Sequence, residues 1–356
     1  PVRRFMNRRI IERICSYGPA RPLPLSMRDD FCSWASLTDR SFTGRQLASV
    51  KHDAPPLDEV AELWKRNGAE IPSEDTSLLF ATFAQWFTDS FLRTDPTNRR
   101  KNTSNHQIDL CQLYGLREYQ TNLLRSFQGG RLKSQIIDGA DGEYPPFIFA
   151  EGSTDTALIL RPDMIDADAR PLHDPKRLAP VYANADPEAL PLMFATGLEH
   201  GNSTVGYTAV NTIFLREHNR IAAVLAKANP DWSDERLFQT ARNINIVLLL
   251  KCLLREYISH AGALAFPFEI DPRIGEGKPW KRENWISLEF NLLYRWHAMV
   301  PEDLTVKGEA YPLARIRNNP RLLLDKGCGA ILSALSTRKA GRIGLGHSHA
   351  IFAQDF

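Results

Sequence analysis

Long helices with an apolar face dominate the pattern of hydrophobic and polar positions along this chain. In the second half, apolar residues recur at helical spacing over four stretches, most of which end at a proline, glycine or asparagine. We expect helices at residues 205–228, 234–261, 282–300 and 320–338. A further helix at 76–94 is apolar around much of its circumference and has Ser73 and Asp75 as candidate caps. Such a helix belongs inside the protein.

The first part of the chain is less regular. We expect a helix at 57–66 and a loop-rich stretch with small strands at 95–191. Residues 1–21 hold six arginines and one glutamate beside apolar residues at helical spacing. This basic helix either packs on the body or lies on an anionic membrane surface. With no internal repeat, we predict a basic helix and wrapping arm at 1–56 and one mainly helical domain at 57–356.

Composition excludes several classes of protein. The 356 residues are 43% hydrophobic and 24% charged, which is enough apolar material for a sizeable core. A net charge of +2 supplies no field that would recruit nucleic acid. Five widely spaced cysteines without a CxxC pair disfavour a disulfide scaffold or zinc ribbon. With no recognisable signal peptide or membrane-spanning segment, we expect a cytoplasmic protein, with the basic helix as its one candidate for peripheral membrane contact.

Two side chains near the end of the 282–300 stretch are candidates for chemistry. In EFNLLYRWHAMVP, Tyr294 and His297 are three residues apart, so on a continuous helix both rings would leave the same side. A neutral histidine can ligate haem iron, and a nearby tyrosine can pass an electron and a proton to an oxidised haem. The same spacing also occurs where both residues simply pack in a core.

This stretch resembles the proximal-haem helix of the animal-type haem peroxidase superfamily, in its cyclooxygenase and fatty-acid dioxygenase branch. NTIFLREHNRIAAVL resembles a second signature of that branch, and further segments follow the family's order along nearly the whole chain. These are SWASLTDRSFTGRQL, FAQWFTDSFLRTD, NHQIDLCQLYG, SQIIDGADGEYPP, PDWSDERLFQTAR and NNPRLLLDKGCGAILSALSTRKAGRIGLG. The YRWH form is most similar to fungal and bacterial linoleate dioxygenases. The resemblance implies a mainly α-helical, cyclooxygenase-like haem peroxidase fold with few short strands.

The resemblance also implies haem b as the cofactor, with His297 as the ligand of its iron. Trp296 and Asn291 match neighbours on that proximal side. Tyr294 matches the residue that becomes a tyrosyl radical and removes a hydrogen atom from the substrate, and Tyr257 matches the tyrosine that positions it. A dry channel would then protect the carbon radical until O₂ adds. The alternative for Tyr257 is a core tyrosine whose hydroxyl bonds to the backbone.

The distal side of the haem departs from the family pattern. Gln85 falls on the family's distal glutamine, but Asp89 stands where the proton-transferring histidine is expected. On a helix Gln85 and Asp89 would share one face. Either Asp89 moves the proton itself, or His200, in GLEHGNSTVG, is the base that Asp89 orients. If His200 is a plain loop histidine, peroxidase activity is weak and lipid hydroperoxide primes the enzyme slowly.

The substrate channel departs from the family as well. Leu264 stands where cyclooxygenases have a tyrosine at the channel mouth, so prostaglandin chemistry is not implied. Arg13 lies near the expected position of the arginine that clamps the fatty carboxylate, and Arg8 or Arg9 could serve instead. Because family members continue well past the AGRIGLG segment, we expect the C-terminal part of the channel to be missing from this chain or closed in another way.

These observations predict a haem-dependent dioxygenase that converts an unsaturated fatty acid and O₂ to a hydroperoxide. One rival is a haem peroxidase that uses H₂O₂ and small aromatic donors. Another is a catalytically weak haem-binding or lipid-binding protein, because the distal histidine is replaced. We expect His347 and His349, in GHSHA, to lie in a surface loop rather than in a metal site, and His218 to be a structural hydrogen-bonding residue.

Overall fold

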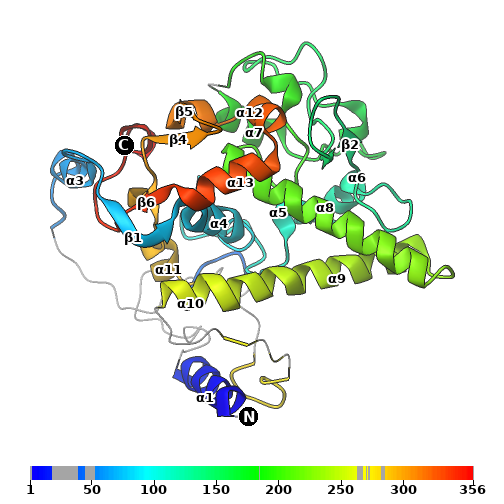
Figure 1. Cartoon of the computed structure of the whole chain (residues 1–356), viewed down its shortest axis with the longest axis horizontal. Helices are drawn as coiled ribbons and strands as arrows, with labels where there is room; N and C mark the ends of the chain where they lie inside the picture. The colour runs from blue at the N-terminus through cyan, green and yellow to red at the C-terminus, as the bar shows by residue number, and fades with distance from the viewer. Residues whose placement is uncertain are drawn as a thin grey trace. The chain divides into compact units, whose positions relative to one another are not determined.

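The computed structural model describes residues 2–17, 39–44, 53–183, 185–262, 268–269, 271, 273–281 and 285–355. These residues are mainly helical (Figure 1). Contacts divide the chain into two compact units. The first unit holds residues 1–53, 89–109 and 246–295, and the second holds residues 54–88, 110–245 and 296–356. Much of the predicted wrapping arm, residues 18–38 and 45–52, lies outside the described residues.

Three helices form the centre of the second unit. They are α4 (Leu78–Thr88), α8 (Val205–Ala228) and α13 (Cys328–Thr337), which pack against one another (Figure 1). Their buried contact residues include Leu78, Ala81, Val205, Ala209, Ile331 and Leu335. Burial of each large aliphatic side chain stabilises the fold by about 1.5–3 kcal/mol. The bounds predicted for α8 are confirmed, since the Thr204 hydroxyl caps its first turn and Asn229 follows its end.

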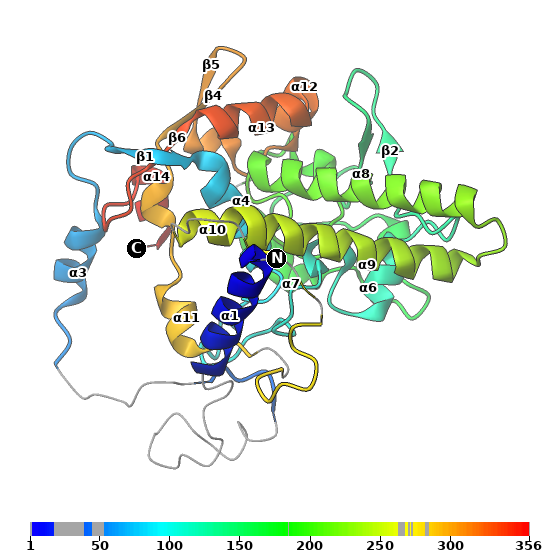
Figure 2. The ribbon, with the colours of Figure 1, turned by 60° about the horizontal axis from the view of Figure 1, so that its bottom comes forward.

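Short elements make up the remainder of the second unit. Its other helices are α3 (Leu57–Trp64), α5 (Cys111–Tyr114), α6 (Glu118–Leu124), α7 (Pro175–Tyr182), α12 (Pro320–Lys326), α14 (His349–Asp355) and the 3-10 turns Pro162–Met164, Leu190–Leu192, His297–Met299 and Leu313–Ile316. Its described strands pair antiparallel as β1 (Pro72–Ser77) with β6 (Lys339–Gly341), β2 (Gln135–Ile136) with β3 (Glu143–Tyr144), and β4 (Asp303–Val306) with β5 (Glu309–Pro312). Figure 2 shows the β4–β5 hairpin beside α13. The predicted character of few, short strands is confirmed.

The first unit begins with the basic helix, α1 (Val2–Tyr17). Asn7 is 3% exposed, and its side-chain amide exchanges two hydrogen bonds with the backbone of Glu269, at 2.9 and 3.3 Å. This contact favours the packed alternative for the helix. Phe5 and Ile14 nevertheless stay 64% and 60% exposed, so only part of the predicted apolar stripe is covered.

Two predicted helices are interrupted although the apolar periodicity runs on. The stretch 234–261 divides into α9 (Asp234–Cys252), a π-helical segment (Leu253–Tyr257) and α10 (Ile258–Ala261). The stretch 320–338 divides into α12 and α13 at Gly327. This glycine has a φ of 83°, and a Cβ there would lie 2.9 Å from a carboxylate oxygen of Asp141. Periodicity therefore located these helices without revealing where they break.

The predicted caps of the 76–94 helix are wrong. Ser73 and Asp75 lie in β1, which pairs with β6. The backbone N–H of Leu78, the first residue of α4, donates to the carbonyl of Arg338 at 2.8 Å. Strand pairing therefore satisfies a donor at this helix start, where the sequence pattern suggested side-chain capping.

One described helical run, Asp234–Ala261, is long and apolar enough to cross a membrane by length and composition. A third of its most apolar window, 33%, is buried inside the protein. A core helix passes the same test, so the finding is weak evidence for a membrane span. This run extends beyond the apolar stretch at residues 244–254. The sequence-based prediction that no segment spans a membrane rested on that shorter stretch.

His218 is a buried structural residue, as predicted. Its Nε2–H donates to the carbonyl of Gly130 at 2.9 Å, so its Nδ1 accepts from the Tyr114 hydroxyl at 2.9 Å. Asn245 donates to the same hydroxyl at 3.1 Å. Burial lowers the pKa of His218 to about 4, so the ring is neutral near pH 7. The network ties α8 to α5 and α9 and leaves this histidine no access to a ligand.

Candidate functional site

Two tyrosines meet in the first unit. The hydroxyl groups of Tyr257 and Tyr294 are hydrogen-bonded to each other. Tyr257 is 6% exposed, while Tyr294 is half-buried. The ring of Tyr294 stacks on that of Phe290, with centroids 4.7 Å apart and planes 20° apart. The pair therefore presents one phenol held at its oxygen by a second phenol and at its ring face by an aromatic side chain.

The π-helical segment between α9 and α10 places Tyr257. At its end the backbone N–H of Ile258 donates to the carbonyl of Leu253, one residue further back than the α-helical partner. A π-bulge shifts the side chains that follow it around the helix, and such bulges occur often at functional sites. Nothing in REYISHAG distinguishes a bulge from a regular helix, so the sequence could predict the tyrosine but not its direction.

The helix predicted at 282–300 ends before it reaches His297. The structure has α11 at Leu288–Leu293, and the N–H of Tyr294 makes its last bond, to the carbonyl of Phe290 at 2.9 Å. Trp296 has φ −112° and ψ 16°, outside the helical range, and the 3-10 turn follows it. The expectation that Tyr294 and His297 leave the same side of one helix is therefore wrong. The unit boundary falls between Arg295 and Trp296.

His297 lies in a closely packed turn of the second unit. The next two residues, Ala298 and Met299, are 7% and 2% exposed, whereas His297 is half-buried. Its ring centroid lies 5.4 Å from that of His347, edge to face. Gly341 passes so close that a Cβ there would be 2.6 Å from the Ala298 carbonyl oxygen. Packing on these sides orients the imidazole and leaves part of it accessible.

Trp296, predicted to neighbour the ligand, packs on α4. Its ring meets Phe80 edge to face, with centroids 5.5 Å apart. Asn291, the other predicted neighbour, belongs to the first unit. It is 3% exposed and donates through Nδ2 to the Thr94 hydroxyl at 2.9 Å. These contacts pack Trp296 on α4 and bury the amide of Asn291, and a place for either residue beside the haem stays a prediction.

Gln85 and His200 come together in the second unit through Ser203. The Gln85 Nε2 donates to the Ser203 hydroxyl at 3.4 Å. The backbone N–H of Ser203 donates to the carbonyl of His200 at 2.8 Å. The side chains of Gln85 and His200 are both exposed. The loop before α8 thus places the backbone of His200 two hydrogen bonds away from the exposed amide of Gln85.

Asp89 does not share a helix with Gln85. It is the first residue after α4, which ends at Thr88, and it falls in the first unit. The structure therefore places Asp89 directly after the end of α4 rather than inside it, and a shared face with Gln85 stays a prediction. The apolar pattern continues past Thr88 in the sequence, so this end of the helix was not readable from periodicity.

The predicted substrate residues are the least described part of the site. Arg13 is exposed on α1. Arg8, an alternative for the same role, lies 3.6 Å from the carboxylate of Glu12. Leu264 lies outside the described residues. A role for Arg13 in holding a carboxylate stays a prediction.

His347 was expected in a surface loop, and that expectation is wrong, since the residue is 4% exposed. Its N–H donates to the Trp64 carbonyl at 2.7 Å, and its carbonyl accepts from the Arg66 N–H at 3.2 Å. This backbone pairing draws the GHSHA segment inward beside His297. His349 does stay exposed, and its Nδ1 lies 3.2 Å from the Glu302 carboxylate.

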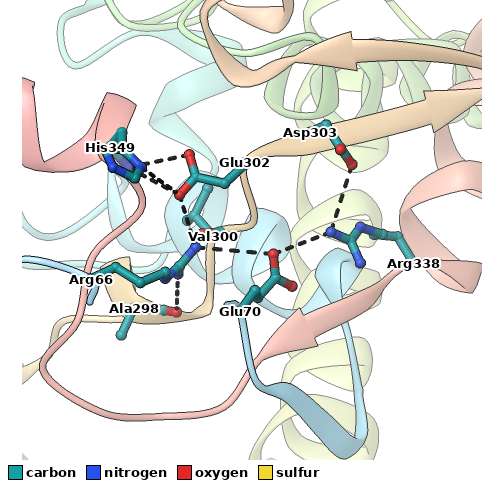
Figure 3. Close-up of polar contacts among 8 residues, drawn as sticks. All are labelled: Arg66, Glu70, Ala298, Val300, Glu302, Asp303, Arg338 and His349. Atoms are coloured by element: carbon teal, nitrogen blue, oxygen red, sulfur yellow. Dashed lines mark hydrogen bonds and ion pairs between the residues drawn. The ribbon is translucent and has the colours of Figure 1, made fainter. Parts of the chain in front are cut away.

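A network of charges that the sequence did not suggest surrounds the His297 turn. Arg66 contacts two backbone carbonyls of this segment and the carboxylates of Glu302 and Glu70, and Arg338 contacts Glu70 and Asp303 (Figure 3). The Arg66 side chain is 10% exposed. These residues are far apart in sequence and belong to no motif, so only the fold brings them together.

The side chains that could bind a metal at this site suit a cofactor that is held by a single imidazole. Among the residues that the structure describes, no group of three or more His, Cys, Asp and Glu could hold a metal ion. A free metal ion needs several such ligands, whereas haem iron already has four porphyrin nitrogens and takes one histidine. A half-buried His297, with two accessible polar side chains elsewhere in the same unit, therefore fits haem better than a bare ion.

Comparisons with known proteins agree with this chemistry. A family model described as animal haem peroxidase matches residues 70–350. Prostaglandin G/H synthase 2 of Equus caballus is 31% identical over 337 residues, which cover 90% of this chain and 51% of that protein. The chain therefore spans about half the length of the curated relatives it matches.

Two solved structures share the fold. Peroxidase A from Dictyostelium discoideum has a TM-score of 0.65 at 20% identity, over 83% of this chain and 62% of that one. A variant of the fatty acid alpha-dioxygenase of Oryza sativa, crystallised with palmitic acid, has a TM-score of 0.57 at 14% identity, over 84% of this chain and 55% of that one. The predicted mainly helical haem peroxidase fold is confirmed.

Proposed function

Because the chain belongs to the animal haem peroxidase family, we propose that it acts as a haem-dependent oxidoreductase that adds O₂ to a fatty acid. The observation that carries the proposal is the hydrogen bond between the hydroxyls of Tyr257 and Tyr294. A phenol whose oxygen is held in this way can give up and take back a hydrogen atom without leaving its place. The names of the similar proteins, a prostaglandin synthase and a fatty acid alpha-dioxygenase, support a fatty acid as the substrate.

In this proposal His297 ligates the iron of haem b. The imidazole is half-buried and sits in a turn whose next two residues are buried, so its direction is set before the cofactor binds. Only Arg295 and Trp296 separate it from Tyr294, so the covalent chain keeps the two Cα atoms within about 11 Å of each other. When bound, haem supplies the oxidising equivalent that a hydroperoxide delivers.

Tyr294 passes this oxidation to the substrate. Having lost its hydroxyl hydrogen atom, the tyrosyl oxygen removes a hydrogen atom from the fatty acid, so that an O–H bond forms as a C–H bond breaks. O₂ then adds to the carbon radical. The resulting peroxyl radical takes the hydrogen atom back from Tyr294, which gives a lipid hydroperoxide and restores the tyrosyl radical. An unsaturated chain is the favoured substrate because its allylic C–H bonds are weaker than those of a saturated chain. Throughout, the hydroxyl of Tyr257 keeps the tyrosyl oxygen in place.

We expect haem-loaded protein, primed with a trace of hydroperoxide, to consume O₂ when linoleate or oleate is added. The expected products carry two atoms of ¹⁸O when the reaction runs under ¹⁸O₂, which mass spectrometry detects. Palmitate serves as the saturated comparison, and we expect it to react more slowly.

Oxidation of phenol by H₂O₂ is the matching assay for the rival peroxidase. Rapid phenol oxidation without O₂ uptake on any fatty acid would overturn the dioxygenase and favour the peroxidase. Protein that binds haem but is inactive in both assays would be the weak binding protein that the replaced distal histidine suggests.

His200 is the proposed proton carrier for the priming hydroperoxide. It is linked to Gln85 through Ser203, and the two side chains are exposed in one unit, which supports a shared distal pocket. Its imidazole can take a proton from the hydroperoxide and return it to the leaving oxygen. Asp89, which lies outside the helix that carries Gln85, is the weaker candidate.

We expect His200→Ala to slow the reaction of the holoprotein with hydroperoxide by at least about 100-fold, the usual contribution of a general acid and base. Stopped-flow spectra of the haem measure this rate. We expect Asp89→Asn to stay within about tenfold of the wild-type protein. The reverse order of the two variants would assign the proton transfer to Asp89.

A further inference from the structure

The turn that carries His297 cannot satisfy its own carbonyl groups. Its two internal hydrogen bonds run from the N–H of Met299 to the carbonyl of Trp296, at 2.9 Å, and from the N–H of Val300 to the carbonyl of His297, at 3.1 Å. Neither bond uses the carbonyls of Ala298 and Val300. Because Ala298 is buried and Val300 is half-buried, these carbonyls need donors from elsewhere in the protein.

Arg66 supplies those donors. Its Nη2 donates to the Ala298 carbonyl at 3.1 Å and to the Val300 carbonyl at 3.2 Å. Its Nη1 lies 3.3 Å from the Glu302 carboxylate. Figure 3 shows the guanidinium between this carboxylate and the two backbone oxygens. The guanidinium is a planar fork with five N–H donors, so it can make these contacts at the same time. A lysine ammonium, a compact charge with three donors on a flexible stem, could not reach all of them from one position.

The acidic partners of Arg66 keep its guanidinium in one place. Glu302 also accepts from the backbone N–H of His349, at 3.1 Å. Glu70, whose side chain is 15% exposed, lies 4.0 Å from the guanidinium of Arg66 and 3.2 Å from that of Arg338. Two carboxylates thus face the cation, and each has a second partner that fixes its own position.

The same short segment also holds the ring beside His297. Arg66 pairs through its backbone with His347, and the Trp64 ring contacts the His347 ring at 5.0 Å. Gly346 fits closely here, since a Cβ on it would lie 3.3 Å from the Cα of Arg66. Both supports of His297, the carbonyl contacts and the neighbouring imidazole, therefore depend on the backbone and side chain of Arg66.

We propose that Arg66 is a positioning residue for His297, setting the direction of the imidazole toward haem iron by holding the turn through the Ala298 and Val300 carbonyls. The inference rests on the proposed function, in which His297 is the iron ligand. It adds a residue outside the sequence motifs, which acts on the ligand through the main chain of the ligand's own turn. Groups that orient a metal ligand from behind commonly change metal affinity when they are removed.

The test compares Arg66→Met with Arg338→Met, using haem titration of the apoprotein and the iron–histidine stretching band in the resonance Raman spectrum of the ferrous holoprotein. Arg338 is the matched control because it belongs to the same network but contacts neither carbonyl. We expect Arg66→Met to weaken haem binding about tenfold or more and to shift or broaden the band. Arg338→Met should lower the melting temperature yet keep the wild-type affinity and band.

Arg66→Lys covers the case in which the methionine variant does not fold, since it keeps the cation but not the fork. We expect it to shift the band in the same direction by a smaller amount. Wild-type affinity and an unchanged band in whichever Arg66 variant folds would overturn the positioning role, and so would an equal shift in Arg338→Met. A separate variant, His297→Ala, tests the proposed function itself. If the iron–histidine stretching band of the wild-type protein survives in His297→Ala, then His297 is not the iron ligand. That outcome overturns both the proposed ligand and the positioning role of Arg66.

Discussion

Replacing His297 by alanine is expected to abolish haem binding, seen as loss of the Soret band after the apoprotein is mixed with haemin. The reason is that one imidazole supplies the proposed bond from the protein to the iron. Removal of a residue behind a metal ligand already costs about 10–100-fold in affinity, so removal of the ligand itself should cost more than about 100-fold. The side chain is half-buried, so the loss of stability should be only about 1 kcal/mol.

Two comparisons make this experiment specific. His260→Ala changes an exposed histidine of α10 and should leave the Soret band as it is in the wild-type protein. Free imidazole added to His297→Ala should restore the band by occupying the space that the side chain has left. A Soret band of normal position and affinity in His297→Ala would contradict the assignment of the ligand.

Replacing Tyr294 by phenylalanine is expected to stop O₂ uptake with linoleate while the protein still binds haem. The phenylalanine ring can stack on Phe290 as the tyrosine does, at a centroid distance of 4.7 Å in the wild-type protein, so the packing should survive. The O–H bond that exchanges the hydrogen atom is lost. We expect the rate, measured with an oxygen electrode, to fall at least about 100-fold, or about 2.7 kcal/mol of barrier.

Tyr257→Phe is the matched control, because it removes the hydroxyl that contacts Tyr294 but leaves the reacting phenol intact. We expect it to slow O₂ uptake about tenfold, in line with the loss of one hydrogen bond of about 1–1.5 kcal/mol. Uptake of O₂ at the wild-type rate in Tyr294→Phe would remove the radical role of this residue. Equal losses in the two variants would mean that the pair acts as a unit rather than as a donor and its support.

The helices were the most predictable part of the fold. The bounds of α8 follow from its apolar period together with Thr204 at its start and Asn229 at its end. These signals are local, because capping and periodicity involve residues within one or two turns of each other. The break at Tyr294 was not predictable in the same way. EFNLLYRWH contains no proline or glycine, yet the helix ends at Leu293, and the next turn, at His297–Met299, is held by Arg66 from a distant segment.

The histidines show the same division. His218 was correctly assigned a structural role from its charged neighbours within one helix. His347 was assigned to a surface loop, because the sequence offers no third metal ligand near the two histidines of GHSHA. In the folded protein it is 4% exposed, since backbone bonds with Trp64 and Arg66 pull it beside His297. Those partners are some 280 residues away along the chain, and no local pattern records them.

By itself, the sequence determined the chemical inventory of this protein: the helices, the family, a histidine suited to iron and a tyrosine suited to hydrogen-atom transfer. The tertiary structure alone decided how these groups are held. It bonded Tyr257, at the end of a π-helical segment, to Tyr294, ended the helix at Leu293, and placed the guanidinium of Arg66 against the carbonyls of the His297 turn. The physical reason is that side-chain type and helical period are local properties. The direction of a reactive group depends instead on hydrogen bonds and packing between segments far apart in the chain.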